Sequence, residues 1–214
     1  MRVAPRLIDP SECVGLVAAG ASLVDLSEPV EFAMGHPPGA INVRFDDRHL
    51  AERVTSVIGA AARLLLMTAD PTQVEPAARQ FVDAGLAVIG IAGGAPADWA
   101  DAGAEWVELR SLVTSDLADG PSQRPYHVLD VREPMEWAVG HVPGAQLIAL
   151  GEVRERLGEV PTDREVAVIC EAGVRSSSAA SLLQAAGVKV FNVADGTAGW
   201  RASGRPLETT DLTE

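Results

Sequence analysis

The stretch LVDLSEPVEFAMGHPPGAINV, residues 23–43, returns farther along the chain as VLDVREPMEWAVGHVPGAQLI, residues 128–148. Matching positions are 105 residues apart and include Asp25/Asp130, Glu28/Glu133, Phe32/Trp137, His36/His141 and Gly39/Gly144. In a second pair of segments, 85–99 and 187–200, Gly85 and Gly94 match Gly187 and Gly196 at a spacing of 102, so about three residues are missing between the blocks of the second copy. Such self-similarity indicates a duplicated unit. The sequence therefore predicts two related domains, residues 1–110 and 111–214.

Short apolar runs alternate with segments of helical period in each copy, which is typical of a parallel sheet with crossover helices. Buried strands are expected at residues 22–26, 63–68 and 86–91 of the first copy and at 126–131, 165–170 and 188–193 of the second. The fold class is therefore α/β, and each domain should have a central parallel β-sheet flanked by helices.

Three further segments carry local signals. DPSE, Asp9 to Glu12, offers an N-cap, a proline at the first helical position and a capping glutamate, so a helix should begin there. SSSAASLLQAAG, residues 176–187, predicts a helix that ends at Gly187. Residues 121–125 predict a turn-rich loop.

Composition disfavours several classes of partner. The 214 residues carry 17 basic and 30 acidic side chains, a net charge of -13, so there is no basic surface for nucleic acid or an anionic membrane. No apolar stretch approaches the roughly 20 residues of a membrane span. The segment MRVAPRLIDPSEC lacks the apolar core of a signal peptide. We therefore expect a cytoplasmic globular protein with no nucleic-acid or membrane partner.

Cys13 and Cys170 are the two cysteines, too few for a disulfide framework, and a reducing compartment would leave both as thiols. Cys170 lies between the strand-like run EVAVI and the predicted helix at 176–187. A thiol at the carboxyl end of a parallel strand lies at the ligand-binding edge of an α/β sheet, where the next helix presents its N-terminus. Free N–H groups, the helix dipole and Arg175 would stabilise a thiolate there.

Cys170 is therefore the candidate nucleophile, and the residues after it form the candidate anion-binding loop: Glu171, Ala172, Gly173, Val174, Arg175 and Ser176. Gly173 should allow a tight loop because glycine reaches positive φ without penalty. Ser176 should cap the following helix. Cys13 lies on the first predicted helix without a charged cradle and is interpreted as a buried structural residue.

Three features together resemble the rhodanese, or sulfurtransferase, superfamily: DVREPMEWAVGHVPGA at 130–145, CEAGVRS at 170–176, and a tryptophan four residues after the glycine turn at Gly196. The resemblance spans nearly the whole chain as a tandem of two rhodanese-like domains. It implies ping-pong sulfur transfer through a Cys170 persulfide, without a metal or organic cofactor. The implied donors are thiosulfate, mercaptopyruvate or a protein or low-molecular-weight persulfide, and the implied acceptors are a thiol, cyanide or a protein.

Two alternatives stay open. One is a non-enzymatic persulfide-relay or binding module, in which a protein partner delivers sulfur to Cys170. The other is a cysteine-based phosphatase or arsenate reductase. Tyrosine phosphatases resemble one another in placing arginine six positions after the cysteine, usually with histidine before it. Here Arg175 is five positions after Cys170 and Ile169 precedes it, so the loop suits a persulfide better than a phosphoryl group.

The first copy lacks the candidate chemistry. At a spacing of 102, Thr68 stands at the position of Cys170, and residues 69–73 contain neither the glycine nor the arginine of the second loop. Pro71 also removes a backbone donor. We therefore expect the first domain to be catalytically inactive.

The same comparison separates structural residues from functional ones. Because His36 persists in the copy without the cysteine, His141 is interpreted as structural rather than as a general base. Asp130 ends a predicted strand and is also expected to be structural. Arg132 is either a support for the active face or part of an ordinary salt bridge with Glu133 or Glu136. The large aromatic side chains are expected to be packing anchors: Phe32, Trp99, Trp137 and Trp200.

Overall fold

The computed structural model describes residues 5–46, 48–117 and 125–210. The chain divides into two compact units, Met1–Glu108 and Leu109–Glu214, and each unit has one five-stranded sheet. The loop predicted at 121–125 lies, apart from Pro125, outside the described residues. Within the described ranges, no helix combines the length and the apolar character needed to traverse a membrane.

The first unit has the strand order β1-β5-β4-β2-β3, and all neighbouring strands are parallel. Along the chain its elements are β1 (Leu7–Ile8), α1 (Pro10–Ala18), β2 (Ser22–Asp25), α2 (Pro29–Met34), β3 (Ile41–Asn42), α3 (Leu50–Ile58), β4 (Arg63–Met67), the 3-10 turn η1 (Pro71–Gln73), α4 (Val74–Asp83), β5 (Ala87–Ala92) and α5 (Pro96–Asp101).

The second unit repeats this plan with the parallel order β6-β10-β9-β7-β8. Its elements are β6 (Ser111–Leu112), η2 (Thr114–Asp116), β7 (His127–Asp130), α6 (Pro134–Val139), β8 (Gln146–Leu147), η4 (Leu150–Glu152), η5 (Leu157–Glu159), β9 (Val166–Ile169), α7 (Val174–Ala185), β10 (Val190–Val193) and α8 (Gly196–Ala202).

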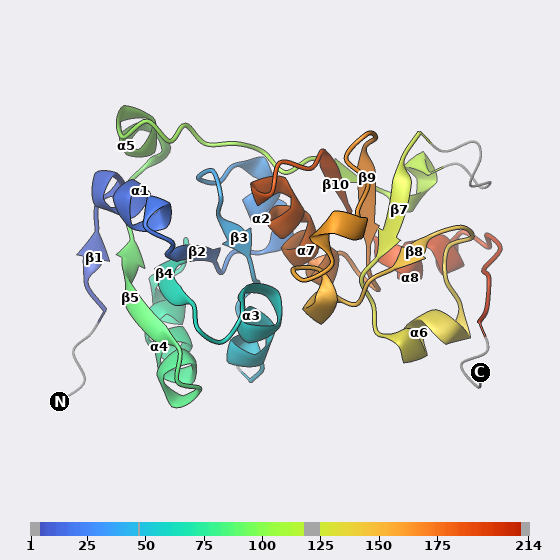
Figure 1. Cartoon of the computed structure of the whole chain (residues 1–214), viewed down its shortest axis with the longest axis horizontal. Coiled ribbons are helices and arrows are strands. Elements are labelled where there is room, and N and C mark those ends of the chain that lie inside the picture. Colours follow the sequence, from blue (N-terminus) through green and yellow to red (C-terminus); the bar gives the residue numbers. More distant parts are fainter. Residues whose placement is uncertain (1–4, 47, 118–124, 211–214) are drawn as a thin grey trace. The chain divides into compact units, whose positions relative to one another are not determined.

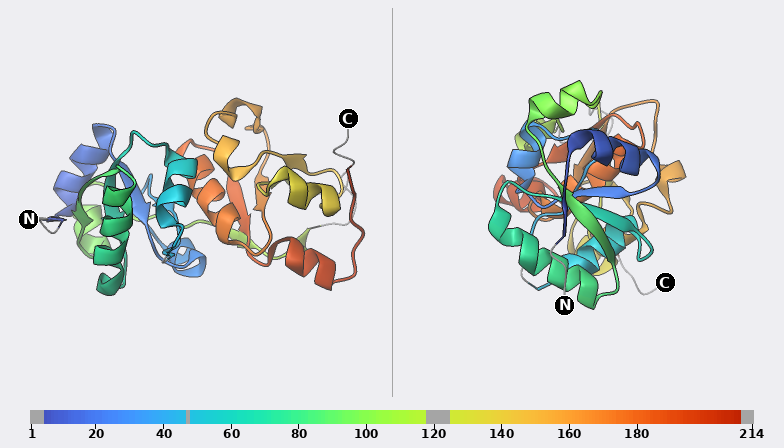
Figure 2. Two further views of the ribbon diagram at one scale, coloured as in Figure 1. Left: turned by 90° about the horizontal axis from the view of Figure 1, so that it is seen from below. Right: turned by 90° about the vertical axis from the view of Figure 1, so that its left-hand side faces the viewer.

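Strand register shows that the two sheets are equivalent. Asp25 at the end of β2 pairs with Met67 of β4, and Asp130 at the end of β7 pairs with Ile169 of β9. Helices cover the sheets: α4 packs against β5 in the first unit, and α7 packs against β9 and β10 in the second (Figure 1 and Figure 2). The predicted α/β class, with parallel sheets flanked by helices, is confirmed.

The predicted start of the first helix is confirmed, but its capping differs in one respect. The Asp9 side chain accepts a hydrogen bond from the Glu12 backbone N–H at 3.0 Å, and Pro10 is the first helical residue. The Glu12 carboxylate does not return a bond to Asp9 and instead accepts from the Arg6 guanidinium. An exposed cation nearby is a stronger partner for a carboxylate than a neutral N–H.

The second copy is three residues shorter than the first in one interval, which lies between β3 and β4 of the first unit and between β8 and β9 of the second. In the first unit, α3 fills the interval between β3 and β4. In the second unit, the interval between β8 and β9 holds the two short 3-10 turns η4 and η5. The duplicated sheets are therefore retained while the crossover differs.

The two predicted structural histidines make the same contacts in both units. The His36 ring stacks on Phe32 with centroids 3.7 Å apart, and the His141 ring stacks on Trp137 at 3.5 Å. Each Nδ1 lies 2.9 to 3.0 Å from the carbonyl oxygen of the aromatic residue beneath it. Both rings are buried. These contacts support a structural role, because they are complete in the unit without the cysteine.

The end of β9 is held by the start of α8. The carbonyl of Cys170 accepts a hydrogen bond from the Thr197 N–H at 2.8 Å, and the carbonyl of Glu171 accepts from Ala198 N–H at 3.0 Å. Gly196 makes this approach possible, since its φ is +58° and a Cβ there would overlap the carbonyl oxygens of Cys170 and Glu171. The loop after β9 therefore depends on a glycine that lies 26 residues beyond Cys170 in the sequence.

We predict that Gly196→Ala destabilises the second unit by about 2 kcal/mol or more beyond the effect of Gly187→Ala, measured by urea unfolding. The control is matched in backbone strain, because Gly187 also has a positive φ of 85° but has open space where a Cβ would lie. Equal losses of unfolding free energy in the two variants would show that the close contact of Gly196 with the loop after β9 does not contribute to the cost of the substitution.

Candidate functional site

Cys170 directly follows β9 and lies four residues before the first residue of α7. The strand is buried along its length, and only 1% of Cys170 is exposed. Both cysteines are free thiols. Cys13 lies within α1, where burial raises the pKa of its thiol to about 11 and so disfavours the reactive thiolate. The predicted burial of Cys13 is confirmed, and the charges of Asp9 and Glu12 add to the raised pKa of its thiol.

The predicted left-handed turn is present at Gly173. Its φ is +80°, and a Cβ at this position would overlap the carbonyl oxygen of Ala194. Gly173 is the N-cap residue of α7, so the helix begins at Val174. Glycine is required here both for the backbone conformation and for the close packing against the chain after β10.

The prediction that Ser176 caps the helix is wrong. Ser176 lies inside the first turn of α7, because the positive φ of Gly173 starts the helix earlier in the chain. Its side chain is fully buried, and its hydroxyl lies 2.6 Å from Asn192 Oδ1 and 3.3 Å from Cys170 Sγ. Ser176 therefore contacts the sulfur directly instead of bonding the helix terminus.

The backbone N–H groups of residues 171–176 form a row of available donors. No described residue accepts a hydrogen bond from any of these six groups. The carbonyls of Cys170 and Glu171 are already bonded to α8. A loop of free N–H groups that leads into the N-terminus of a 12-residue helix is suited to hold an anion beside the Cys170 sulfur.

Arg175 carries its charge close to the loop but is paired with a carboxylate. Its two terminal nitrogens each donate to Glu136 at 2.6 Å. These hydrogen bonds are the main reason that the pKa of Arg175 is raised, and the negative charge of a Cys170 thiolate adds to the effect. The pKa of Glu136 is lowered chiefly by the same bonds. The sequence suggested a cation facing the sulfur, whereas the structure shows a bidentate ion pair beside it.

Glu171 is also part of an ion pair. Its carboxylate accepts from the Arg201 guanidinium and, at 2.9 Å, from the Thr197 hydroxyl. The Arg201 hydrogen bond is the largest cause of the lowered pKa of Glu171. Arg201 and Thr197 were not identified from the sequence, because their role depends on α8 reaching the loop.

Asp130 and Arg132 form a buried ion pair, 0% and 2% exposed, respectively. Arg132 Nε lies 3.0 Å from both carboxylate oxygens of Asp130, and its Nη2 donates to Asp130 at 2.8 Å and to the Gly140 carbonyl at 2.9 Å. The expected salt bridge of Arg132 with Glu133 or Glu136 is wrong, since Asp130 is two residues away and already buried. Arg132 Nη1 also lies 3.9 Å from Glu171, so the pair supports one wall of the site.

A hollow of about 430 Å³ adjoins this loop. Its wall combines charged side chains with two strongly exposed apolar side chains of α6: Arg132, Glu136, Glu171 and Arg201, with Met135 and Val139. Among the described residues, no group of three or more His, Cys, Asp or Glu side chains is arranged to hold a metal ion.

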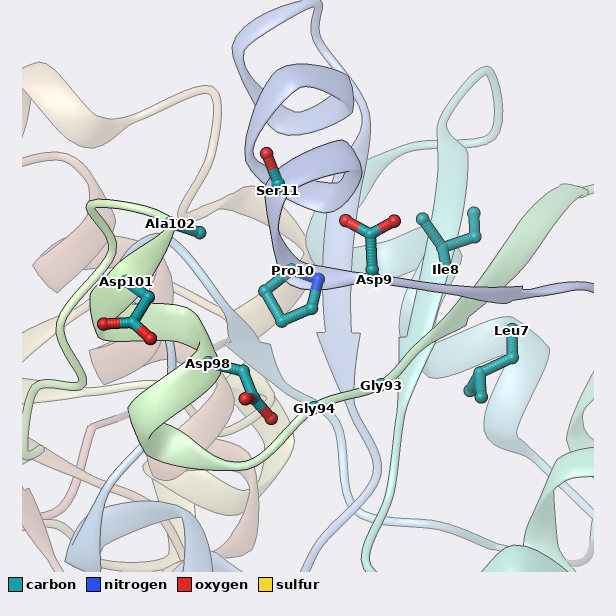
Figure 3. A pocket seen from close by; sticks show the side chains of 10 residues that line it. All are labelled: Leu7, Ile8, Asp9, Pro10, Ser11, Gly93, Gly94, Asp98, Asp101 and Ala102. Carbon is teal, nitrogen blue, oxygen red and sulfur yellow. The ribbon is translucent and has the colours of Figure 1, made fainter.

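The corresponding place in the first unit is different. Thr68 follows β4, and its hydroxyl donates to Gln73 Oε1 at 2.7 Å and accepts from the Asp70 N–H at 3.0 Å. A hollow of about 650 Å³ in this unit lies elsewhere, between α1 and α5 (Figure 3). Its charged side chains are Asp9, Asp98 and Asp101, and it includes no residue of the loop after Thr68. An acidic hollow is unsuited to an anionic sulfur species.

Comparison with known proteins places these features in a family. The model of the rhodanese-like domain matches residues 113–203. YtwF of Bacillus subtilis is 30% identical over 101 residues, which are 47% of this chain and 98% of that protein. A sulfurtransferase of Allochromatium vinosum is 33% identical over 81 residues, 37% of this chain and 76% of that protein. YrkF of Bacillus subtilis is 40% identical over 80 residues, and the chain spans 43% of its length. The chain belongs to the rhodanese-like family.

Proposed function

We propose that the protein is a sulfurtransferase that carries a sulfane sulfur on Cys170. The observation that carries the proposal is a buried cysteine at a strand end, followed by six backbone N–H groups that no described residue accepts. Such a row of donors stabilises both a thiolate and the outer sulfur of a persulfide anion. The name of the Allochromatium relative agrees with this chemistry.

Two half-reactions make up the transfer. In the first, the Cys170 thiolate attacks the outer sulfur of a persulfide donor R–S–SH, the donor S–S bond breaks, and R–S⁻ leaves while Cys170–S–SH forms. In the second, an acceptor thiolate attacks the outer sulfur, and the Cys170 thiolate leaves with the electron pair of the broken bond. No external oxidant or reductant is needed, because the S–S bond that forms replaces the one that breaks.

The charges around Cys170 favour a thiol persulfide over thiosulfate as the donor. Each nearby cation is paired with a carboxylate: Arg175 with Glu136, Arg201 with Glu171, and Arg132 with Asp130. Among the described residues that line the hollow, a dianion therefore meets no positive side chain that is not paired with a carboxylate. The exposed Met135 and Val139 beside the hollow suit the organic part of a thiol persulfide, whether a small molecule or a protein side chain.

We further propose that residues 111–214 form the catalytic domain and residues 1–110 an inactive one. Thr68 cannot form a persulfide, and its hydroxyl is already engaged by Gln73 and Asp70. Asp70 also uses its carboxylate to accept from the Thr72 N–H at 2.9 Å, so a local turn occupies the place of the anion-binding loop.

The proposal predicts that Cys170→Ser abolishes sulfur transfer and the +32 Da adduct of one sulfur atom, measured by turnover with a panel of donors and by intact mass. Cys13→Ser is the matched control, because it also replaces a buried free thiol but should leave both readouts unchanged. Sulfur loading that survives in Cys170→Ser would rule out the mechanism. Stoichiometric loading of the wild type without turnover of any small donor would favour the protein-fed relay.

Because the charged side chains that line the hollow are paired, removing either member of the Arg201–Glu171 pair should change the KM for thiosulfate in opposite directions. Arg201→Ala removes the main cation paired with Glu171 and should raise the KM for thiosulfate about tenfold, whereas Glu171→Gln should lower it by a similar factor. Glu171→Arg should lower it as well and make the rate more dependent on salt. The KM for an uncharged persulfide donor serves as the control and should change little. Equal thiosulfate KM values in all variants would place the donor away from this ion pair.

Replacing Thr68 alone should not create a second site. In a Cys170→Ser background, Thr68→Cys should give no +32 Da adduct after donor treatment, since Pro71 has no N–H and Asp70 adds a carboxylate beside the thiol. Grafting EAGVRS onto residues 69–74 together with Thr68→Cys should restore some loading. Robust loading by Thr68→Cys alone would mean that the sheet edge, and not the loop, activates the cysteine.

A further inference from the structure

Asn192 is a buried polar residue in the middle of an otherwise apolar strand. It is 2% exposed, and its neighbours Val190, Phe191 and Val193 in β10 are buried as well. Its Nδ2 donates to the Gly173 carbonyl at 3.1 Å, and its Oδ1 accepts from the Ser176 hydroxyl at 2.6 Å. Burying a primary amide is costly unless it makes hydrogen bonds. The two hydrogen bonds with Gly173 and Ser176 offset the cost of burying Asn192.

This polar pair is absent from the first unit. Asn192 pairs with Val168 in the second sheet, and the equivalent pairing in the first sheet is Ile91 with Leu66. At the spacing of 102, Val74 stands at the position of Ser176. Whether the position of Asn192 is matched by strand register (Ile91) or by the spacing of 102 (Gly90), the unit that lacks the cysteine has neither the amide nor the hydroxyl.

The Ser176 hydroxyl has one proton and two neighbouring acceptors. At 2.6 Å from Asn192 Oδ1 it donates to the amide oxygen, and its oxygen can then accept the S–H of a Cys170 thiol, 3.3 Å away. A Cys170 thiolate has no proton to give and, being charged, is the stronger acceptor. The hydroxyl then turns toward the sulfur, and the Asn192 oxygen loses its donor.

We propose that Asn192 is a positioning residue that competes with Cys170 for the proton of the Ser176 hydroxyl. When Cys170 is a thiolate, the hydroxyl stabilises its charge. When Cys170 bears the outer sulfur and its Sγ is uncharged, Asn192 takes the hydroxyl proton back. This role concerns the carrier state of Cys170 and so rests on the proposed function, but the proton competition itself exists in the protein without any donor.

The charged groups around the loop are the same in every variant needed to test this. Arg175 of α7 interacts with the Cys170 charge and is paired with Glu136 of α6. Glu171 is paired with Arg201 of α8, and the Asp130–Arg132 pair lies at the end of β7. Since none of these side chains is replaced, a change in Cys170 ionisation reports on the hydroxyl and the amide.

The experiment is a double-substitution cycle with Ser176→Ala and Asn192→Leu in a Cys13→Ser background. The rate of Cys170 alkylation by iodoacetamide is followed by intact mass across pH, and its midpoint gives the ionisation of the thiol. Ser176→Ala should raise the midpoint by about one pH unit, because the thiolate loses a hydrogen bond. This readout needs no sulfur donor, so it can succeed or fail independently of the sulfurtransferase proposal.

The effect of Asn192→Leu on the alkylation midpoint is measured with Ser176 present and again in the Ser176→Ala background. The midpoint shift with Ser176 present should be lower than the shift in the Ser176→Ala background by roughly half a pH unit or more. Any loosening of the loop through the lost bond to Gly173 occurs in both backgrounds and cancels in this difference. The same shift in both backgrounds, or a difference of the opposite sign, would overturn the proposal and leave Asn192 as a brace for the loop.

Discussion

The site depends on two hydrogen bonds between the start of α8 and the end of β9. Because Thr197 and Ala198 donate to the carbonyls of Cys170 and Glu171, these carbonyls are occupied before the loop turns. The N–H groups that follow are left without acceptors in the described structure, and they lead into the N-terminus of α7. A polypeptide segment has as many carbonyls as N–H groups, so a loop can gather donors only where its acceptors are satisfied elsewhere. Gly173 and Gly196 allow the two close approaches that this requires.

The duplication shows which interactions belong to the scaffold. Both units have the same strand order, the same parallel register at the ends of the central strands and the same histidine stacked on an aromatic ring. Apart from the crossover, which is α3 in one unit and η4 with η5 in the other, the difference is local. One unit has Thr68 and its hydrogen-bonded turn, and the other has the cysteine with its loop, Ser176 and Asn192. One sheet architecture therefore accommodates either a closed turn or a loop whose N–H groups have no acceptor among the described residues.

Much of the fold could be predicted because its signals are local. Strands β2, β4, β5, β7, β9 and β10 coincide with apolar runs, and the paired segments revealed the duplication. The two-residue strands β1, β3, β6 and β8 carry too few residues for a periodic signal. The positive φ of Gly173 could also be anticipated from the glycine itself.

The rest of the site could not be predicted from the sequence, because it depends on contacts between segments that are far apart in the chain. The start of α7 is set partly by the packing of Gly173 against Ala194, so Ser176 became a buried neighbour of the sulfur instead of a cap. The partners of Glu171 come from α8. Asn192 offered a usable signal, a lone amide in the run VKVFNV where the first copy has Gly90 at the spacing of 102. Arg132 offered another, since an aspartate two residues earlier at a strand end is a closer partner than either nearby glutamate.

We propose that Cys170 carries a sulfane sulfur and that the N–H groups of residues 171–176 hold it. This proposal is tested most directly by amide NMR of the protein before and after sulfur loading, with the +32 Da adduct confirmed by mass. We expect downfield shifts concentrated in the amide protons of residues 171–176, as they become hydrogen bonded, and unchanged amide protons at Ala69, Asp70, Thr72 and Gln73. Loading of Cys170 that leaves the 171–176 amides unshifted would contradict the proposal.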